Sequence, residues 1–155
     1  MVAAPLPHDE YNRIANLRRF EILDTAAEEA FDRYTRIAAK ILNVPISLIS
    51  LVDDVRQWFK SHHGLDARET PRDWAFCAYA ILAPDQLVVP DAAEDPRFSD
   101  NPLVTGEPGI RFYVSVHSPV SLVQRSASAL NPNGFPACQT AEVLIRWGHE
   151  VEGTA

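Results

Sequence analysis

The first residue whose type could support chemistry is Cys77, in the stretch Phe-Cys-Ala-Tyr-Ala-Ile at positions 76–81. A thiol near the start of a helix can have a lowered pKa, which makes it a nucleophile or a redox group. However, Cys77 also belongs to an apolar stripe with Trp74, Ala78 and Ile81, and unpaired cysteines are among the residues most often buried. The pattern favours core packing for Cys77, with thiol chemistry as the alternative.

A second set of residues brackets a long loop in the second half of the chain and combines charges with aromatic rings. Arginine can hold an anion through paired hydrogen bonds, and an aromatic ring can stack on a flat ligand. The competing interpretation is structural, because loop aspartates cap turns and an arginine can brace a loop through a carboxylate. The structural role is the more frequent one, and ligand binding is the functional hypothesis. The members of this set are Asp91, Asp95, Arg97, Phe98, Arg111, Phe112 and Tyr113.

A third set lies on one alternating segment, where Trp58, Lys60 and His62 share a face. Trp58 could form a pocket wall or a dimer face, whereas on a plain surface strand Lys60 and His62 would be solubilising groups. His62 and His63 are adjacent, so they point to opposite faces and cannot bind one metal ion together. The histidines and cysteines match no zinc-ligand spacing, and we expect neither a metal nor another cofactor.

The totals of the sequence limit the classes of partner. A chain of 155 residues has the size of one domain with a single core. The net charge of −7 repels phosphate backbones, which argues against nucleic acid. No apolar run approaches the ~20 residues of a membrane-spanning helix, and the first residues lack the features of a secretory signal. We therefore expect a cytoplasmic protein without a membrane contact.

The stretch from Val44 to Gly64 predicts the centre of the fold. Ile46–Val52 is almost entirely apolar, as is typical of a strand covered on both faces. After a polar break, Arg56–His62 alternates and predicts a half-exposed second strand. Together they predict a hairpin in an antiparallel sheet. Further short strands are expected at Leu87–Val89 and Arg111–Val116.

Three helices are expected before the long loop. The first covers Asp9–Leu23, with a weak apolar stripe. The pair Thr25 and Glu28 has the spacing of a capping box and predicts the start of the second helix, which ends at Asn43. The third is expected to begin at Thr70 and to end before Pro84. The predicted inward residues of the second helix are Ala30, Phe31, Tyr34, Ile37, Ala38, Ile41 and Leu42.

The composition changes after Tyr113, where charged residues become sparse and Ser, Ala, Asn and Pro become frequent. Residues Thr140–Trp147 could form a short helix, although an isolated helix of this length is marginal. These features divide the chain into an N-terminal helix (1–24), a central domain (25–116) and an atypical tail (117–155). We interpret the tail as disordered or as the product of a frame shift.

Taken together, residues 13–113 resemble a GAF domain, the small sensory module of bacterial signalling proteins. The resemblance rests on several blocks in one order. Two features depart from the pattern: Tyr79 replaces a typical His, and the strand after Tyr113 lacks the Ala-Gly-x-Pro-Leu and Gly-Thr-Leu-Cys motifs of the family. The matching blocks are ILDT, ISLVD, QWFKS, ETPR, FCAYAI, DPRFSDNPLV and GIRFY.

The resemblance implies an α/β (α+β) fold, an antiparallel sheet flanked by helices with a pocket between the sheet and the later helix and loop. Because of the departures, we expect the last strand and the closing helix to be missing. The implied function is non-catalytic: binding of an unknown small molecule or a protein, homodimer formation, and action in trans on a histidine kinase or diguanylate cyclase. The candidate ligand-binding residues are Trp58, Trp74, Cys77, Asp91, Arg97, Phe98, Arg111 and Tyr113.

Two alternatives remain open. A branch of the same family reduces free methionine sulfoxide with cysteines near a similar helix, so Cys77 could serve a thiol-dependent reductase. The additional cysteines of such an enzyme are absent from the loop before Arg111. The second alternative is a dimerisation unit that binds no ligand.

Overall fold

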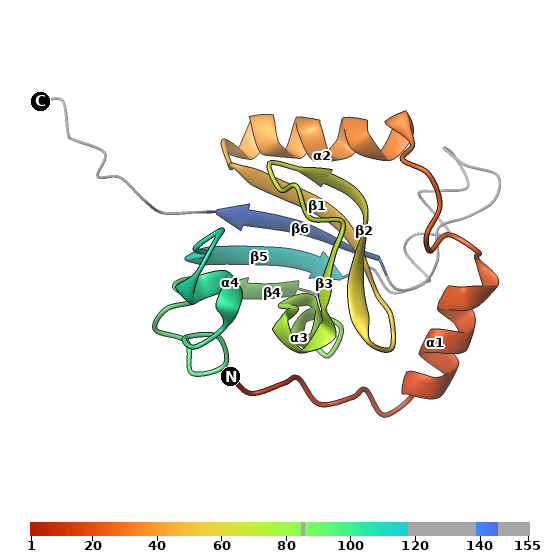
Figure 1. Cartoon of the computed structure of the whole chain (residues 1–155), viewed down its shortest axis with the longest axis horizontal. Helices are drawn as coiled ribbons and strands as arrows, with labels where there is room; N and C mark the ends of the chain where they lie inside the picture. Colours follow the sequence, from red (N-terminus) through yellow and green to blue (C-terminus); the bar gives the residue numbers. More distant parts are fainter. Residues whose placement is uncertain (85, 118–138, 146–155) are drawn as a thin grey trace, which may run out of the picture.

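The computed structural model describes residues 1–84, 86–117 and 139–145, and the side chains of 1–84 and 86–116. Its centre is a six-stranded antiparallel sheet in the order β3-β2-β1-β6-β5-β4 (Figure 1). The strands β1 and β2 form the predicted hairpin, with Leu51 opposite Trp58. The strands are β1 (Ile46–Val52), β2 (Arg56–His63), β3 (Glu69–Pro71), β4 (Gln86–Val89), β5 (Phe112–His117) and β6 (Gln139–Ile145).

Helices cover both faces of this sheet. The helix α2 (Glu29–Leu42) lies along β1 and β2 on one face, whereas α3 (Cys77–Ala80) and α4 (Pro102–Thr105) lie on the other side (Figure 1). The helix α1 (Glu10–Arg19) lies beside the end of the β1–β2 hairpin. Beneath α3, an apolar core includes stacked rings of Phe76 and Phe98, whose centroids are 4.0 Å apart. The resemblance to an antiparallel sheet flanked by helices is therefore confirmed.

The expected absence of the last strand is wrong. The segment Gln139–Ile145 forms β6, which pairs with β1 on one side and with β5 on the other. It occupies a central position in which it satisfies main-chain hydrogen bonds of two strands that would otherwise be open edges. This pairing explains why the predicted short helix from Thr140 does not form over the described residues. Trp147 lies outside them, and the expected absence of a closing helix also concerns residues outside them.

The predicted capping box is also wrong. The helix α1 ends at Arg19, and α2 begins at Glu29 with Glu28 as its N-cap residue and without a side-chain capping hydrogen bond. The Thr25 hydroxyl instead donates to the Ile22 main-chain oxygen at 2.7 Å. It also accepts a hydrogen bond from Lys60, so Thr25 joins the helix connection to β2 rather than to the α2 backbone.

The inward face of α2 differs from the predicted stripe. Phe31, Thr35 and Ala39 are the buried residues of α2, whereas Ile37 and Ile41 are 47% and 75% exposed. The line of buried residues is set by the sheet surface that α2 covers, which belongs to β1 and β2. Ile37 and Ile41 lie about 160° and about 120° around the helix axis from Thr35, at 3.6 residues per turn, and therefore remain exposed. The predicted end at Asn43 is confirmed, because this residue adopts a left-handed conformation with φ of 51°.

The predicted third helix is divided into shorter elements. Thr70 lies in β3, where it pairs with Gln57 of β2. A single helical turn, η1 (Arg72–Trp74), follows, and α3 begins only at Cys77. Pairing of the β3 backbone with β2 thus overrides the local helix-start signal of Thr70 and Pro71.

Candidate functional site

A hollow of about 450 Å³ lies beside β3, and we call it the β3 pocket. Its walls come from β2, β3, the connection between them, and the segment around α4. The lining is largely apolar, as is usual for a small-molecule site. The lining residues are Leu48, Gln57, Phe59, Gly64, Leu65, Asp66, Ala67, Glu69, Thr70, Pro71, Trp74, Phe76, Leu103, Glu107, Pro108 and Ile110.

The β3 pocket contains a buried hydroxyl that no protein group satisfies. Thr70 is 8% exposed, and its Oγ1 has no hydrogen-bond partner in the described part of the chain. Gln57, paired with Thr70 across the β2–β3 ladder, also lines the pocket. Because an unsatisfied buried hydroxyl costs free energy, a ligand that displaced the pocket wall enough to reach it would gain a hydrogen bond.

The β3 pocket depends on Gly64, which ends β2. Gly64 has a φ of +72°, and a Cβ added to it would lie 1.8 Å from the main-chain oxygen of Pro45. Glycine therefore permits both the turn and the close approach of the two backbones. Trp74, which is 36% exposed, lines the same pocket.

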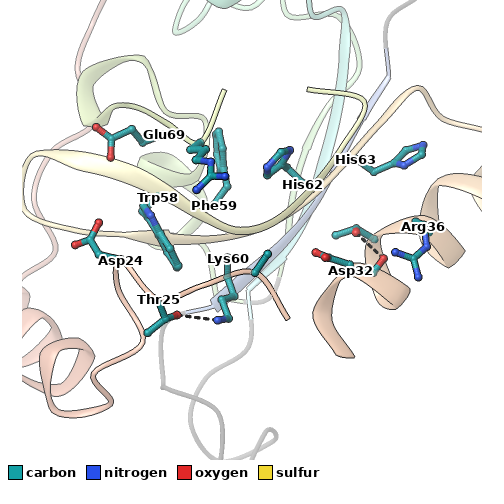
Figure 2. Close-up of a pocket in the computed structure, with 13 residues that line it drawn as sticks. Asp24, Thr25, Asp32, Arg36, Trp58, Phe59, Lys60, His62, His63 and Glu69 are labelled. Carbon is teal, nitrogen blue, oxygen red and sulfur yellow. Dashed lines mark hydrogen bonds between the residues drawn. The ribbon is translucent and has the colours of Figure 1, made fainter. Parts of the chain in front are cut away.

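A second hollow of about 410 Å³ lies between β2 and α2, and we call it the α2 pocket (Figure 2). Only Phe59 and Glu69 line both pockets. The lining of the α2 pocket is more polar, and it draws on the connection before α2 as well as on the strands. Its residues are Asp24, Thr25, Ala27, Asp32, Thr35, Arg36, Trp58, Phe59, Lys60, His62, His63, Arg68 and Glu69.

Lys60 is an internal tether of the α2 pocket, not the exposed solubilising group that the sequence allowed. Its side chain is 0% exposed. The ammonium group donates to Thr25 Oγ1 at 2.7 Å, to the Ala26 main-chain oxygen at 3.0 Å and to Glu28 Oε1 at 2.5 Å. Figure 2 shows the contact with Thr25. Its three donors are thus all used to hold the connection that precedes α2.

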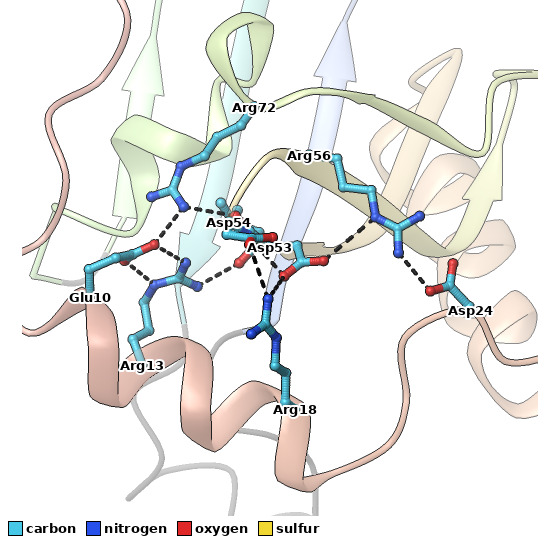
Figure 3. Close-up of polar contacts among 9 residues, drawn as sticks. Glu10, Arg13, Arg18, Asp24, Asp53, Asp54, Arg56 and Arg72 are labelled. Atoms are coloured by element: carbon cyan, nitrogen blue, oxygen red, sulfur yellow. Dashed lines mark hydrogen bonds and ion pairs between the residues drawn. The ribbon is translucent and has the colours of Figure 1, made fainter.

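A cluster of charges fastens α1 to the hairpin and to the residue that follows β3 (Figure 3). Glu10 accepts hydrogen bonds from Arg13 at 2.6 Å and from Arg72 at 2.5 Å. Arg72 also donates to the Asp53 main-chain oxygen at 2.7 Å, and Arg13 donates to that of Val52 at 2.6 Å. Because Arg72 directly follows Pro71 of the β3 pocket, the same short segment contacts both the pocket and α1.

Partial burial and ion pairing act in opposite directions on Glu10. Burial raises the pKa of its carboxyl group, but hydrogen bonds and charges from Arg13 and Arg72 outweigh that effect and lower the pKa below its ordinary value. The ionised form of Glu10 is therefore the form that stabilises the docked α1.

Cys77 and Tyr113 lie together in the core rather than in either pocket. The Cys77 sulfur is 3.3 Å from the Tyr113 hydroxyl and 3.4 Å from the Ser50 hydroxyl. Gln57 Nε2 donates to Ser50 Oγ at 3.1 Å and contacts the sulfur at 3.5 Å. Complete burial raises the pKa of Tyr113. This buried network matches the structural interpretation of Cys77 given by the sequence pattern.

The loop residues proposed from the sequence have internal partners. Arg97 donates to both carboxylate oxygens of Asp95, at 2.9 and 2.6 Å, and these hydrogen bonds lower the pKa of Asp95. Asp91 accepts from the Ala93 main-chain N–H at 2.9 Å, and Arg111 donates to the Val104 main-chain oxygen at 3.1 Å. Phe98 is buried under α3.

The structure thus distributes the eight predicted ligand residues over several places. Trp74 lines the β3 pocket, Trp58 lines the α2 pocket, and the other six line neither. Sequence reasoning missed Gln57 and Thr70. The signal available for Thr70 was its position in the Glu-Thr-Pro-Arg block, but its spacing to Asp73 indicated a helix cap.

We expect the Cys77 thiol to be unreactive in the folded protein. In a Cys138→Ser protein, a thiol-specific disulfide reagent should modify Cys77 only as fast as the protein unfolds, because its sulfur is fully buried. The double variant Cys77→Ser, Cys138→Ser has no cysteine and is the control for any signal that does not come from a thiol. Fast modification under native conditions, together with reduction of free methionine sulfoxide, would instead support the reductase alternative.

The described ranges contain no group of three or more His, Cys, Asp or Glu side chains arranged to hold a metal ion. Within the same ranges, no helix combines the length and hydropathy that a membrane-spanning segment requires.

The sheet, its flanking helices and the pocket beside β3 define a sensory domain of the GAF type. The GAF domain family matches residues 26–116, and the chain belongs to this family. It is 48% identical over 113 residues to the cyclic di-GMP phosphodiesterase PA2567 of Pseudomonas aeruginosa. That match covers 73% of this chain but only 19% of the phosphodiesterase, so the likeness concerns a small part of that enzyme.

Solved structures support the same fold. The GAF domain of A. aeolicus nlh2 in an inactive state has a TM-score of 0.53 and 10% identity, over 90% of this chain and 80% of that one. The GAF domain of an Acinetobacter phosphoenolpyruvate-protein phosphotransferase has a TM-score of 0.52 and 14% identity, with the same coverages. Free methionine-R-sulfoxide reductase from Neisseria meningitidis has a TM-score of 0.52 and 13% identity, over 94% and 81%. At these identities the likeness concerns the fold alone.

Proposed function

We propose that this GAF domain is a non-catalytic sensor of the cytoplasm that binds a small molecule in the β3 pocket. The observation that supports this site is the buried, unsatisfied hydroxyl of Thr70 in a mainly apolar hollow. A ligand with a flat apolar body and one hydrogen-bonding group would fill the hollow and satisfy Thr70. Trp74 supplies an aromatic wall for such a ligand.

The proposed output is a change in the docking of α1. Thr70 and Pro71 line the β3 pocket, and the next residue, Arg72, is bonded to Glu10 of α1. A ligand that moves β3 would therefore change the contact that holds α1. The likeness to part of a cyclic di-GMP phosphodiesterase supports a role in bacterial signal transduction, with a phosphodiesterase, histidine kinase or diguanylate cyclase as the controlled enzyme.

Self-association is a further part of this proposal. Ile37 and Ile41 present exposed apolar surface on α2, and such surface is often covered by a partner. A second copy of the chain is the partner we propose. Sedimentation equilibrium of the wild type and of Ile41→Glu tests it, since a dimer that uses this face must dissociate in the variant.

Thermal-shift screening against nucleotides and small metabolites tests the pocket. A compound selective for the folded form at 100 times its Kd stabilises the protein by about 2.7 kcal/mol. We expect Thr70→Val to weaken its binding about fivefold to tenfold, because one hydrogen bond is lost. The stability of the unliganded variant should change by less than about 0.5 kcal/mol, since the hydroxyl has no protein partner to lose.

Arg97→Gln is the matched control, because Arg97 belongs to the ligand residues predicted from the sequence but lies outside the β3 pocket. Binding that is lost in Arg97→Gln and kept in Thr70→Val would place the ligand at the long loop instead. A screen in which no compound raises the melting temperature would favour a pure interaction domain.

A further inference from the structure

The α2 pocket is a second hollow on the sheet. Within the described residues, its acceptors are bonded to other protein groups, whereas several of its donors are not. Its carboxylates are already engaged. Arg56 donates to Asp24 at 2.6 Å and to Glu69 at 2.5 Å, and the Ser61 hydroxyl donates to Asp32 at 2.6 Å. Asp24 and Glu69 therefore share the charge of one arginine, whereas Asp32 is hydrogen-bonded but keeps its negative charge.

Several donors of the α2 pocket, by contrast, have no protein partner. Trp58 is 7% exposed, and its indole N–H makes no hydrogen bond within the described part of the chain. Within the same part, the Arg68 guanidinium and the His63 imidazole have neither a hydrogen bond nor an ion pair. The Trp58 N–H is not sealed inside the protein, so it can donate to a group that enters the hollow.

The backbone brings these donors to one rim. The Phe59 N–H donates to the Arg68 main-chain oxygen at 2.9 Å, which fixes Arg68 beside β2. Trp58 lies opposite Glu69 in the same ladder. His63 extends from the end of β2 toward α2, as Figure 2 shows. An incoming group on this rim meets these donors and the charge of Arg68, and Trp58 and Phe59 line the same hollow.

We propose that the α2 pocket binds a small molecule that carries a phosphate or carboxylate group on a flat ring. The anionic group accepts hydrogen bonds from Arg68 and from the Trp58 N–H, and the ring contacts the aromatic wall. Phosphate and carboxylate groups both present a pair of acceptor oxygens that a guanidinium can bind with two parallel hydrogen bonds. This site is independent of the β3 pocket, because it lies on the other side of β2 and uses different donors.

The test is an NMR titration that follows the indole N–H signal of Trp58, assigned with Trp58→Phe. The probes are phenyl phosphate, benzoate and inorganic phosphate. We expect a saturable shift with at least one of the two ring-bearing probes and weaker binding of inorganic phosphate, which lacks the ring. Stronger binding of phenyl phosphate would identify phosphate as the preferred group, and stronger binding of benzoate would identify carboxylate.

The deciding variant is Arg68→Gln, which removes the charge of an exposed side chain without disturbing a contact that the fold needs. It should weaken binding about tenfold, which corresponds to the loss of one charge-assisted hydrogen bond. Arg97→Gln makes the same chemical change at a distant loop and should leave the titration unaltered, as should Thr70→Val in the β3 pocket. The absence of a saturable shift, or equal affinity of the wild type and Arg68→Gln, overturns the proposal.

Discussion

Gly64→Ala is expected to destabilise the protein by about 3 kcal/mol or more, which is a large fraction of the stability of a domain of this size. The added Cβ would lie 1.8 Å from the Pro45 main-chain oxygen and 2.9 Å from its carbonyl carbon. Both are backbone atoms at the start of β1, so they cannot rotate away as a side-chain end could. The positive φ of Gly64 adds about 1 kcal/mol for any residue with a Cβ.

Urea unfolding followed by circular dichroism measures this effect. Gly106→Ala is the matched control, because Gly106 has an ordinary φ of −113° and its added Cβ would lie 3.0 Å from the nearest atom. We expect it to cost about 1 kcal/mol. Equal unfolding midpoints for Gly64→Ala and the wild type would show that β1 and the turn after β2 separate more easily than this geometry implies.

The consequence of this prediction reaches the proposed ligand site. Gly64 lines the β3 pocket, so a displacement of its backbone changes the pocket wall. A Gly64→Ala protein that remains folded at low temperature should therefore bind a β3-pocket ligand more weakly. Gly64 is thus needed both for the turn after β2 and for the wall of the β3 pocket.

The pairing of the central hairpin was predictable from the sequence, but its second strand is not half-exposed as expected, because residues 57–61 are all buried between the layers on the two faces of the sheet. Ile46–Val52 is apolar except for Ser47 and Ser50, and it is buried on both faces apart from the half-buried Ile49. Predictions that rested on a single local signal in the sequence were less reliable. The helix-start signal at Thr70 was overridden by strand pairing with Gln57, and the apolar stripe of α2 could not show which flank would meet the sheet.

The sites were harder to predict than the strands, for a physical reason. Whether Lys60 is a surface group or a buried tether depends on Thr25 and Glu28, which come from a connection far away in the sequence. Whether the Thr70 hydroxyl finds a hydrogen-bond partner likewise depends on the groups that surround it in three dimensions. By contrast, Arg97 and Asp95 are only two residues apart, and their local pairing was foreseeable.

Glu10→Gln is expected to reduce the stability by about 2 kcal/mol, because it leaves the buried guanidinium of Arg72 without its carboxylate. Glu29→Gln is the control. It removes an ion pair with Arg36 at the exposed start of α2, and the expected cost is below about 0.5 kcal/mol. Hydrogen exchange should show the loss in α1 first, since Glu10 joins this helix to Arg72.

The same contact gives the docking of α1 a defined pH dependence. The pKa of Glu10 is lower in the folded protein than in the unfolded chain, so its contribution is complete above the ordinary glutamate value of about 4.3. It is lost as the pH falls through the lowered pKa, where the carboxyl group takes up a proton and the ion pairs with Arg13 and Arg72 end. Protection of α1 amides should thus fall below about pH 4 in the wild type. In Glu10→Gln, this step should be absent, and an unchanged step would assign the acid sensitivity to another carboxylate near α1, such as Asp54, whose pKa is also lowered.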